Sequence, residues 1–390
     1  MLRVLLFLLL AVLPSGACLW DRDTLQEEAK GKLDTVMAIT GWFDRYPARY
    51  YEMRLDRVTK ELASKPGSLD LYDDAGVACS RLGKHDESIA WMEKKKAVLD
   101  AKPAEDSKED RYRYLSNLGT FHLIRWITRP EEVRSTDLAD LKTSETFIAQ
   151  ALELNPNAHF GREKFQLMLI RWLLAPAPGE DSYGDLNFLN VDAMLRTNPA
   201  GVQIPRELNL EEARKGITGL IQLGAAWQSI DTFQALRLGL HSEKMAFLAH
   251  LAYLRQKELY DSGLRSLHPS ETVREEIVPA FGGGFHGVDQ VDRFFQKARA
   301  AAGSREKSWI AYQEGRFRQG MHPDTHSDFW KDWEEPEFPK IPGPTLIQRA
   351  ERNPGMFLIL FCAALMLGFV GTVVVVKKLA ALLRRQKLRA

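Results

Sequence analysis

Residues 282–287, with the sequence GGGFHG, satisfy the spacing G-x-G-x-x-G of a phosphate-binding loop. A dinucleotide site needs this loop to leave a β-strand and to open a helix, so that backbone amides meet the pyrophosphate. Here the loop follows the helical pattern ETVREEIV and a Pro-Ala-Phe sequence, with no strand pattern nearby. The context therefore favours a flexible connection over a cofactor site.

Histidines form two candidate ligand pairs for a metal. His322 and His326 are four residues apart, but Pro323 between them favours a turn. Two imidazoles at this spacing converge on one ion only when they lie on a helix. His241 and His250 are nine residues apart and no third ligand accompanies them, so we expect no metal site.

The motifs of common enzyme classes are missing from the sequence. It contains no G-x-S-x-G, P-loop, H-E-x-x-H or C-x-x-C pattern. We therefore predict no catalytic residue and no cofactor. A membrane-anchored enzyme stays open as an alternative, because catalytic groups are assembled in space from distant positions.

Charge is distributed unevenly along the chain. The composition, 45% apolar and 27% charged, is that of a globular protein, and the formal net charge is +1. The last fourteen residues hold six Lys or Arg and no acid, and without these and Arg3 the chain has 46 basic against 52 acidic residues. A mildly acidic domain lacks the basic face that nucleic acid requires.

The N-terminus has the pattern of an export signal. Arg3 precedes an apolar run over residues 4–13, which is too short to cross a bilayer, and Gly16-Ala17 suits a cleavage site. Cleavage after Ala17 would make Cys18 the first mature residue. A lipoprotein is the alternative, although Ser15 stands where a lipobox usually has a large aliphatic residue.

A second apolar segment, residues 355–376, is predicted to be a transmembrane helix. Residues 356–376 carry no charge, and a helix of that length spans about 30 Å. The basic tail, residues 377–390, places the C-terminus in the cytoplasm by the positive-inside rule. Ala364, Gly368 and Thr372 form a small-residue stripe that predicts helix–helix association in the membrane.

The exported region contains no Asn-x-Ser/Thr acceptor and no cysteine pair that could form a disulfide framework. A secretory-pathway ectodomain of this length is expected to have a few such acceptors by chance. We therefore expect a bacterial inner-membrane protein with a single span and a periplasmic or extracellular ectodomain.

Residues 69–103 have the pattern of two short helices joined at Leu82-Gly83. Small residues at Gly76 and Ser88 allow close approach, and Tyr72 and Met92 fill the adjacent space. This arrangement resembles a tetratricopeptide (TPR) repeat. It departs from that family at Cys79, where an aromatic residue is usual, and at Lys95, where alanine is usual.

Two further units extend the resemblance to Leu174. The second begins at Tyr112, has the pair Leu118-Gly119, and ends in Asn155-Pro156 after an insertion of about a dozen residues, 128–140. Residues 158–174 resemble the first helix of a third. The resemblance implies an all-α fold of TPR-like antiparallel helical hairpins, a short solenoid, with one C-terminal transmembrane helix.

The TPR resemblance also implies a groove that binds a protein or peptide partner. The groove would be lined by the non-core face of each first helix, on which the candidate partner-binding residues are Asp73, Val77, Ser80, Arg81, Asn117, Thr120 and Lys164. Some family members clamp a peptide carboxylate with Lys and Asn. Asp73 and Val77 occupy those places here, so the clamp is missing.

The predicted organisation has eight parts. They are a signal peptide (1–17), a helical segment (18–65), TPR-like repeats (66–174), a linker or insertion (175–208), a second helical region (209–300), a loop and Pro-rich stalk (301–354), a transmembrane helix (355–376) and a basic tail (377–390). The stalk rests on Pro336, Pro339 and Pro342, spaced as in polyproline II. These features favour a membrane-anchored interaction scaffold; an enzyme or an envelope structural protein are the alternatives.

Overall fold

The computed structural model describes residues 19–24, 33–103, 105–156, 161–175, 186–191, 208–280 and 287–343, and scattered positions between 355 and 378. The regular elements of these residues are all helices, so the predicted all-α class is confirmed. The chain divides into two compact units, residues 1–283 with 291–339 and residues 284–290 with 340–390.

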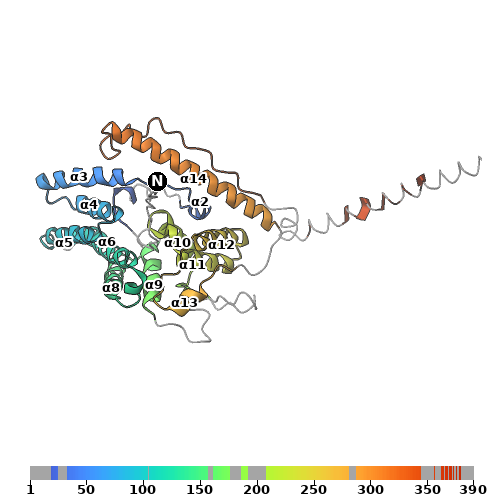
Figure 1. Cartoon of the computed structure of the whole chain (residues 1–390), viewed down its shortest axis with the longest axis horizontal. Helices are drawn as coiled ribbons and strands as arrows, with labels where there is room; N and C mark the ends of the chain where they lie inside the picture. Colours follow the sequence, from blue (N-terminus) through green and yellow to red (C-terminus); the bar gives the residue numbers. More distant parts are fainter. Residues whose placement is uncertain are drawn as a thin grey trace, which may run out of the picture. The chain divides into compact units, whose positions relative to one another are not determined.

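The helices follow the chain in the order shown in Figure 1. They are α2 (Thr35–Thr40), α3 (Ala48–Ser64), α4 (Leu69–Arg81), α5 (His85–Asp100), α6 (Lys108–Ile127), α7 (Glu131–Arg134), α8 (Ala139–Leu154), α9 (Arg162–Leu174), α10 (Leu210–Gln222), α11 (Ile230–Ser242), α12 (Ala246–Asp261), α13 (Glu271–Glu276) and α14 (Val288–Arg318). Apart from the one-turn α7, each helix from α3 to α12 packs against the next. Neighbours in sequence are therefore neighbours in space.

The first hairpin joins α4 to α5 through a turn at Gly83, whose φ of +74° suits a residue without a Cβ. A Cβ at Gly76 would lie 2.9 Å from the Met92 side chain and 3.0 Å from Phe121. The missing side chain thus lets α5 and α6 approach α4. Met92 and Phe121 are fully buried at this contact.

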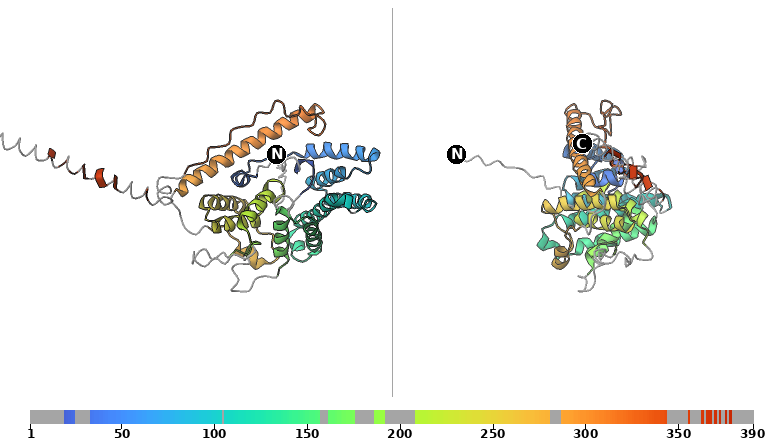
Figure 2. Two further views of the ribbon diagram at one scale, coloured as in Figure 1. Left: turned by 180° about the vertical axis from the view of Figure 1, so that it is seen from behind. Right: turned by 90° about the vertical axis from the view of Figure 1, so that its right-hand side faces the viewer.

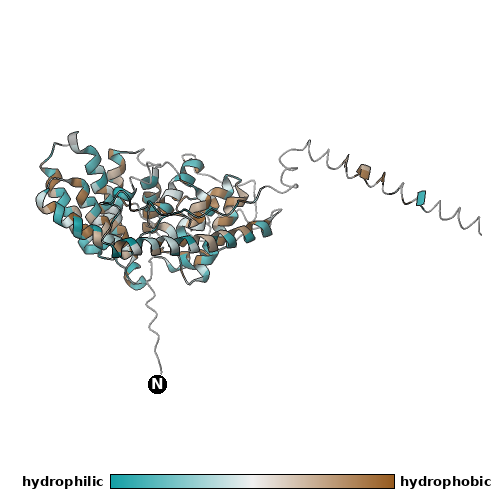
Figure 3. Ribbon diagram, turned by 90° about the horizontal axis from the view of Figure 1, so that it is seen from above, coloured by the Kyte–Doolittle hydropathy of each residue, from teal (hydrophilic) through white to brown (hydrophobic). Residues whose placement is uncertain are grey.

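The next helix pairs repeat this close packing at glycine. A Cβ at Gly119 on α6 would lie 2.8 Å from Ile148 on α8, and one at Gly219 on α10 would lie 2.8 Å from Arg162 on α9. The helices carry hydrophobic residues on part of their surface and hydrophilic residues elsewhere (Figure 3). Such helices bury one face against a neighbour.

The segment before α3 does not form one long helix. Helix α2 begins at an Asp34 cap and ends at Gly41, which has a φ of +82° and lies against the Trp227 ring. It packs on α10 and α12, whereas α3 packs on α4. Residues 19–46 therefore connect two distant parts of the succession of helices, while residues 25–32 lie outside the described ranges.

The loop predicted from residue 301 is wrong for residues 301–318, which belong to α14. Its buried positions recur every three or four residues at Ala298, Ala302, Arg305, Trp309, Gln313 and Phe317. Gly303 and Gly315 lower the intrinsic helix propensity of this stretch. Both face open space, so the helix does not need them for close packing. Helix α14 lies on the same side as α2 and α3, away from α9 (Figures 1 and 2).

The Pro-rich stretch predicted as a stalk lies against the first unit as far as Phe338, whose ring centroid is 5.2 Å from that of Trp42. Most of the predicted span, 355–376, and all of residues 1–18 lie outside the described residues. Within the part of the chain that the structure describes, no helix combines the length and the apolar character that crossing a bilayer requires.

Candidate peptide-binding face

Of the seven residues predicted to line a groove, most are buried, and Asn117 contacts the chain's own residue Trp20. Five of the seven are buried, namely Asp73, Val77, Ser80, Asn117 and Thr120. Residues 19–24, here called the N-terminal segment, lie across α4, α6 and α9 and contact side chains from all three helices. We call this contact surface the α4–α6–α9 face.

Asn117 on α6 binds the backbone of the N-terminal segment. Its Oδ1 accepts a hydrogen bond from the Trp20 amide at 2.7 Å, and its Nδ2 donates to the Trp20 carbonyl at 2.9 Å. One side-chain amide thus satisfies both polar groups of one residue, as a neighbouring strand would. This contact is made with the backbone of Trp20 alone, so it does not depend on the side chain at that position; residues 22–24, which follow, are helical.

Asp73 and Lys95 fix the orientation of the Asn117 amide. Asp73 accepts hydrogen bonds from Asn117 Nδ2 at 3.1 Å and from Lys95 Nζ at 2.6 Å. Burial raises the pKa of Asp73 to about 6, although the charge of Lys95 opposes the rise. Lys95, the departure from the TPR pattern, therefore compensates for the buried acid.

The Trp20 indole is enclosed by α6 and α9. Its Nε1 donates to Ser116 Oγ at 2.9 Å and to Glu163 Oε1 at 3.0 Å. The Tyr112 ring meets it edge-on with a centroid separation of 5.8 Å, and the Arg162 guanidinium lies 4.7 Å from the indole centroid. Trp20 is only 1% exposed, so the site encloses the whole indole and provides acceptors for its N–H group.

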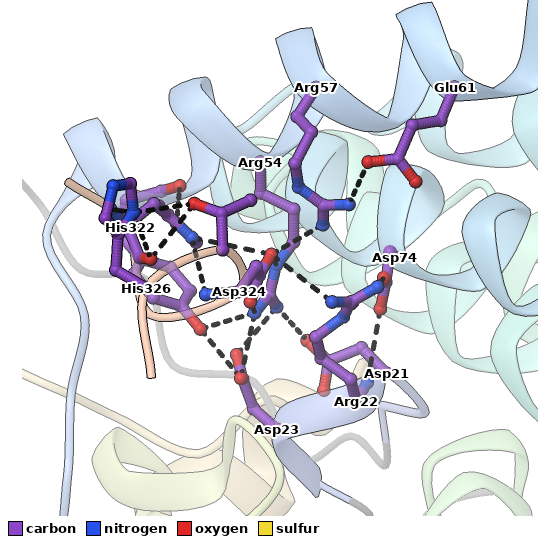
Figure 4. A network of polar contacts seen from close by, with 12 residues as sticks. Asp21, Arg22, Asp23, Arg54, Arg57, Glu61, Asp74, His322, Asp324 and His326 are labelled. Carbon is purple, nitrogen blue, oxygen red and sulfur yellow. Dashed lines mark hydrogen bonds and ion pairs between the residues drawn. The ribbon is translucent and has the colours of Figure 1, made fainter. Parts of the chain in front are cut away.

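The charged residues that follow Trp20 each meet an opposite charge (Figure 4). Asp21 and Asp23 accept hydrogen bonds from Arg54 Nη1 at 3.2 and 2.7 Å. Arg22 lies 2.6 Å from Asp74 on α4, and its backbone amide also donates to that carboxylate at 3.2 Å. The segment is therefore bound through alternating negative, positive and negative side chains.

Arg54 on α3 connects the N-terminal segment to the loop after α14. Its side chain is fully buried and donates to Asp324 at 2.8 and 2.6 Å, while Arg57 donates to the same carboxylate at 2.6 Å. Burial acts to raise the pKa of Asp324, but the hydrogen bonds and the charge of Arg54 hold it well below its usual range. Asp324 therefore stays ionised.

The ionised form of Asp21 is less stabilised by its surroundings than that of Asp324. Burial, and then the neighbouring charge of Asp23, raise the pKa of Asp21 to about 7, even though Arg54 acts in the opposite direction. Its ionised form is therefore destabilised at neutral pH. The bound state of the segment carries an electrostatic cost at this position.

The other predicted partner-binding residues contact neighbouring elements of the same chain. Thr120 accepts a hydrogen bond from Gln166 at 3.0 Å, the exposed Arg81 donates to the Gly224 carbonyl at 3.1 Å, and Lys164 pairs with Glu212 at 3.0 Å. Of the membrane stripe, Ala364 and Gly368 lie outside the described residues, whereas the described Thr372 is helical and exposed.

The structure describes His322 and His326 but not the glycine pattern. His322 and His326 lie in a turn, where His322 Nε2 contacts the Tyr50 carbonyl at 3.1 Å. Within the described ranges, no group of three His, Cys, Asp or Glu could hold a metal ion. Residues 282–286 are outside the described ranges.

Sequence reasoning did not identify Trp20, Arg54 or Asp324 as members of one site. Two signals pointed to the first of these: the large aromatic follows the predicted cleavage position by three residues, and a run of alternating charges, Asp-Arg-Asp, comes next. Neither signal specifies what the segment contacts. Comparisons with protein-family models, with curated proteins and with solved structures find no match to this chain.

Proposed function

We propose that this protein is a membrane-anchored interaction scaffold whose TPR-like hairpins bind a short segment of a protein on the exported side of the membrane. The observation that carries the proposal is the docked N-terminal segment. A helix face that holds backbone through Asn117, an indole through Ser116 and Glu163, and charges through Arg54 and Asp74 has the features of a peptide-binding site.

The succession of hairpins supports the TPR part of this proposal. Helices α4 with α5 and α6 with α8 pack closely at glycines on their first members, Gly76 and Gly119. On the remaining surface of those first helices, Asn117 contacts the N-terminal segment, and Asp73 accepts a hydrogen bond from the Asn117 side chain. Stacked helix pairs with a continuous ligand-binding face are typical of solenoid proteins.

The membrane anchor is proposed from residues 355–376. The described apolar side chains in that range are exposed, from 57% for Val370 and Val375 to 74% for Leu367. Exposed apolar side chains in such a series mark a surface that another molecule or a bilayer covers. Cysteine labelling in intact cells tests the orientation: a cysteine placed after residue 377 should react only once the inner membrane is opened.

Peptide binding to the full chain in detergent tests the scaffold itself. Arg22→Glu places a negative charge beside Asp74 and should weaken the attachment of the N-terminal segment. A fluorescent peptide with the sequence of residues 19–24 should then bind this variant, as measured by anisotropy. Addition of Asn117→Ala should abolish binding, whereas Thr143→Ala on the exposed face of α8 should not.

If the folded Arg22→Glu chain binds no peptide at millimolar concentration, the proposal of a peptide-binding face fails. Circular dichroism of each variant confirms that loss of binding is not loss of fold.

A further inference from the structure

The N-terminal segment fills the α4–α6–α9 face in the manner of a ligand. Leu19 and Trp20 are each 1% exposed, and Trp20, Arg22 and Asp23 contact side chains of other elements. Those partners lie at least 27 positions away in sequence. The segment therefore contacts the rest of the chain in the way that a bound peptide would.

The face discriminates by side-chain order. From the Trp20 position onward the face offers an indole site and then Asp74 for a base, while Arg54 of the adjoining α3 pairs with the acid before that base and with the acid after it. Buried charges need an opposite charge in good geometry. A peptide with the reverse charge order would bury Asp against Asp74 and Arg against Arg54.

The contacts that hold the segment are of a kind that is readily exchanged. Buried ion pairs contribute little net stability, because the cost of removing the charges from water offsets their attraction. The raised pKa of Asp21 reflects such a cost. A segment needed only for a permanent core would be held more strongly by apolar residues, as Met92 and Phe121 are between α4, α5 and α6.

We propose that the α4–α6–α9 face, together with Arg54 of α3, binds a segment of a partner protein in which a tryptophan is followed by an acidic, a basic and an acidic residue. The chain's residues 19–24 compete with that partner from within. This inference rests on the proposed function and adds the chemical class of the ligand. The partner must displace Trp20 from its site between Ser116 and Glu163.

Because residues 19–24 are covalently attached, they compete with a free peptide at a high effective concentration. Covalent attachment through a short linker gives a ligand an effective concentration on the order of millimolar. A free peptide of equal intrinsic affinity therefore competes only at about that concentration. A partner held at the same membrane reaches high local concentration, so anchoring of the scaffold favours the exchange.

Peptide binding to the full-length chain in detergent tests the inference. The probes are labelled LWDRDT, which copies residues 19–24, and LWRDRT, in which the three charges are reversed. With the Arg22→Glu chain, LWDRDT should bind at least about tenfold more tightly than to the wild type, and LWRDRT at least about tenfold more weakly than LWDRDT. Lys60→Glu, which changes an exposed pair on α3, is the control and should behave as the wild type.

A charge exchange gives a positive result that a folding defect cannot imitate. In the Arg22→Glu, Asp74→Lys chain the internal segment should bind again. LWDRDT should then bind this chain no more tightly than it binds the wild type. In the Asp74→Lys chain with Arg22 retained, LWDEDT should bind more tightly than LWDRDT. A failure of this reversal in a folded chain would overturn the proposed charge order.

The outcomes separate the two proposals. Equal binding of LWDRDT and LWRDRT would overturn the stated ligand class, but it would leave the peptide-binding function intact. Binding of neither peptide would refute both. A wild-type dimer that dissociates on introduction of Arg22→Glu would overturn the partner in favour of segment exchange between two copies of the chain.

Discussion

The contact between the hairpins and the contact with the N-terminal segment are built from opposite chemistry. Between α4, α5 and α6 the packing is apolar, with Met92 and Phe121 against Gly76. On the α4–α6–α9 face a single indole is surrounded by hydrogen bonds and ion pairs. Burial of apolar surface stabilises the fold and is not directional. Hydrogen bonds and ion pairs depend on geometry and charge, so they favour one sequence over another.

The largest expected effect is the difference in free energy of unfolding between a substitution in the hairpin core and one in the N-terminal segment. Phe121→Ala should lower the free energy of unfolding by about 3–5 kcal/mol, since a fully buried ring is replaced by a cavity. Trp20→Ala, although its side chain is equally buried, should cost less, because its effect is limited to the free energy of docking. Urea unfolding followed by circular dichroism measures both. Equal losses would show that residues 19–24 belong to the core.

Arg54 tests the charged side of the comparison. Arg54→Ala leaves Asp23 and Asp324 buried without their main cationic partner, and breaking a buried pair in this way costs about 3–5 kcal/mol. Its effect should approach that of Phe121→Ala, because the Arg54 side chain also holds the loop after α14. Lys60→Ala, which removes an exposed pair, should change stability by less than about 1 kcal/mol.

Asn117 tests recognition of the backbone. Asn117→Ala removes both hydrogen bonds to Trp20 and should cost about 1–3 kcal/mol, since the Trp20 amide and carbonyl lose their partners. Hydrogen exchange at the amides of residues 19–24 should accelerate, while that of α11 and α12 stays unchanged. Uniform acceleration in all helices would indicate a structural role and weaken the contrast.

The smallest effect is a pH dependence of docking. The pKa of Asp21 is raised to about 7 in the folded chain, so its protonated form is favoured there and its contribution is greatest at low pH. Docking should therefore weaken as the pH rises from about 5 to 8. Burial also raises the pKa values of Asp73 and Asp74, so they act in the same direction. Asp324 has the opposite sign, but it acts only near and below the ordinary pKa of an aspartate, about 4.

Asp21→Asn separates this residue from the others. Asparagine resembles the protonated acid, so the variant should be more stable than the wild type at pH 8, by an amount on the order of 1 kcal/mol, and its pH slope should be smaller. Unfolding midpoints at pH 5, 6, 7 and 8 give the comparison. An unchanged slope would assign the dependence to Asp73 and Asp74 instead.

Much of the helical framework was accessible from local sequence. The turn at Gly83 and the close approaches at Gly76 and Gly119 follow from small residues at helical spacing. Helix α14 beyond residue 300 was not predicted, and Gly303 and Gly315 are tolerated within it because both face open space. Of the residues predicted to bind a partner, Asn117 contacts the chain's own residue Trp20, and the binding role of the set stays a prediction.

The sequence by itself determined many of the helices and the turn at Gly83, because helical periodicity and turn residues act over a few positions. Only the tertiary structure decided that Trp20 meets Asn117, 97 positions away, and that Arg54 meets Asp324, 270 positions away. The chain contains 52 acidic and 53 basic residues, and no local pattern distinguishes the pair that will meet. The packing of the helices decides which remote segments, and therefore which charged side chains, come together. A charge that is then buried needs an opposite charge beside it, because an unpaired buried charge is costly.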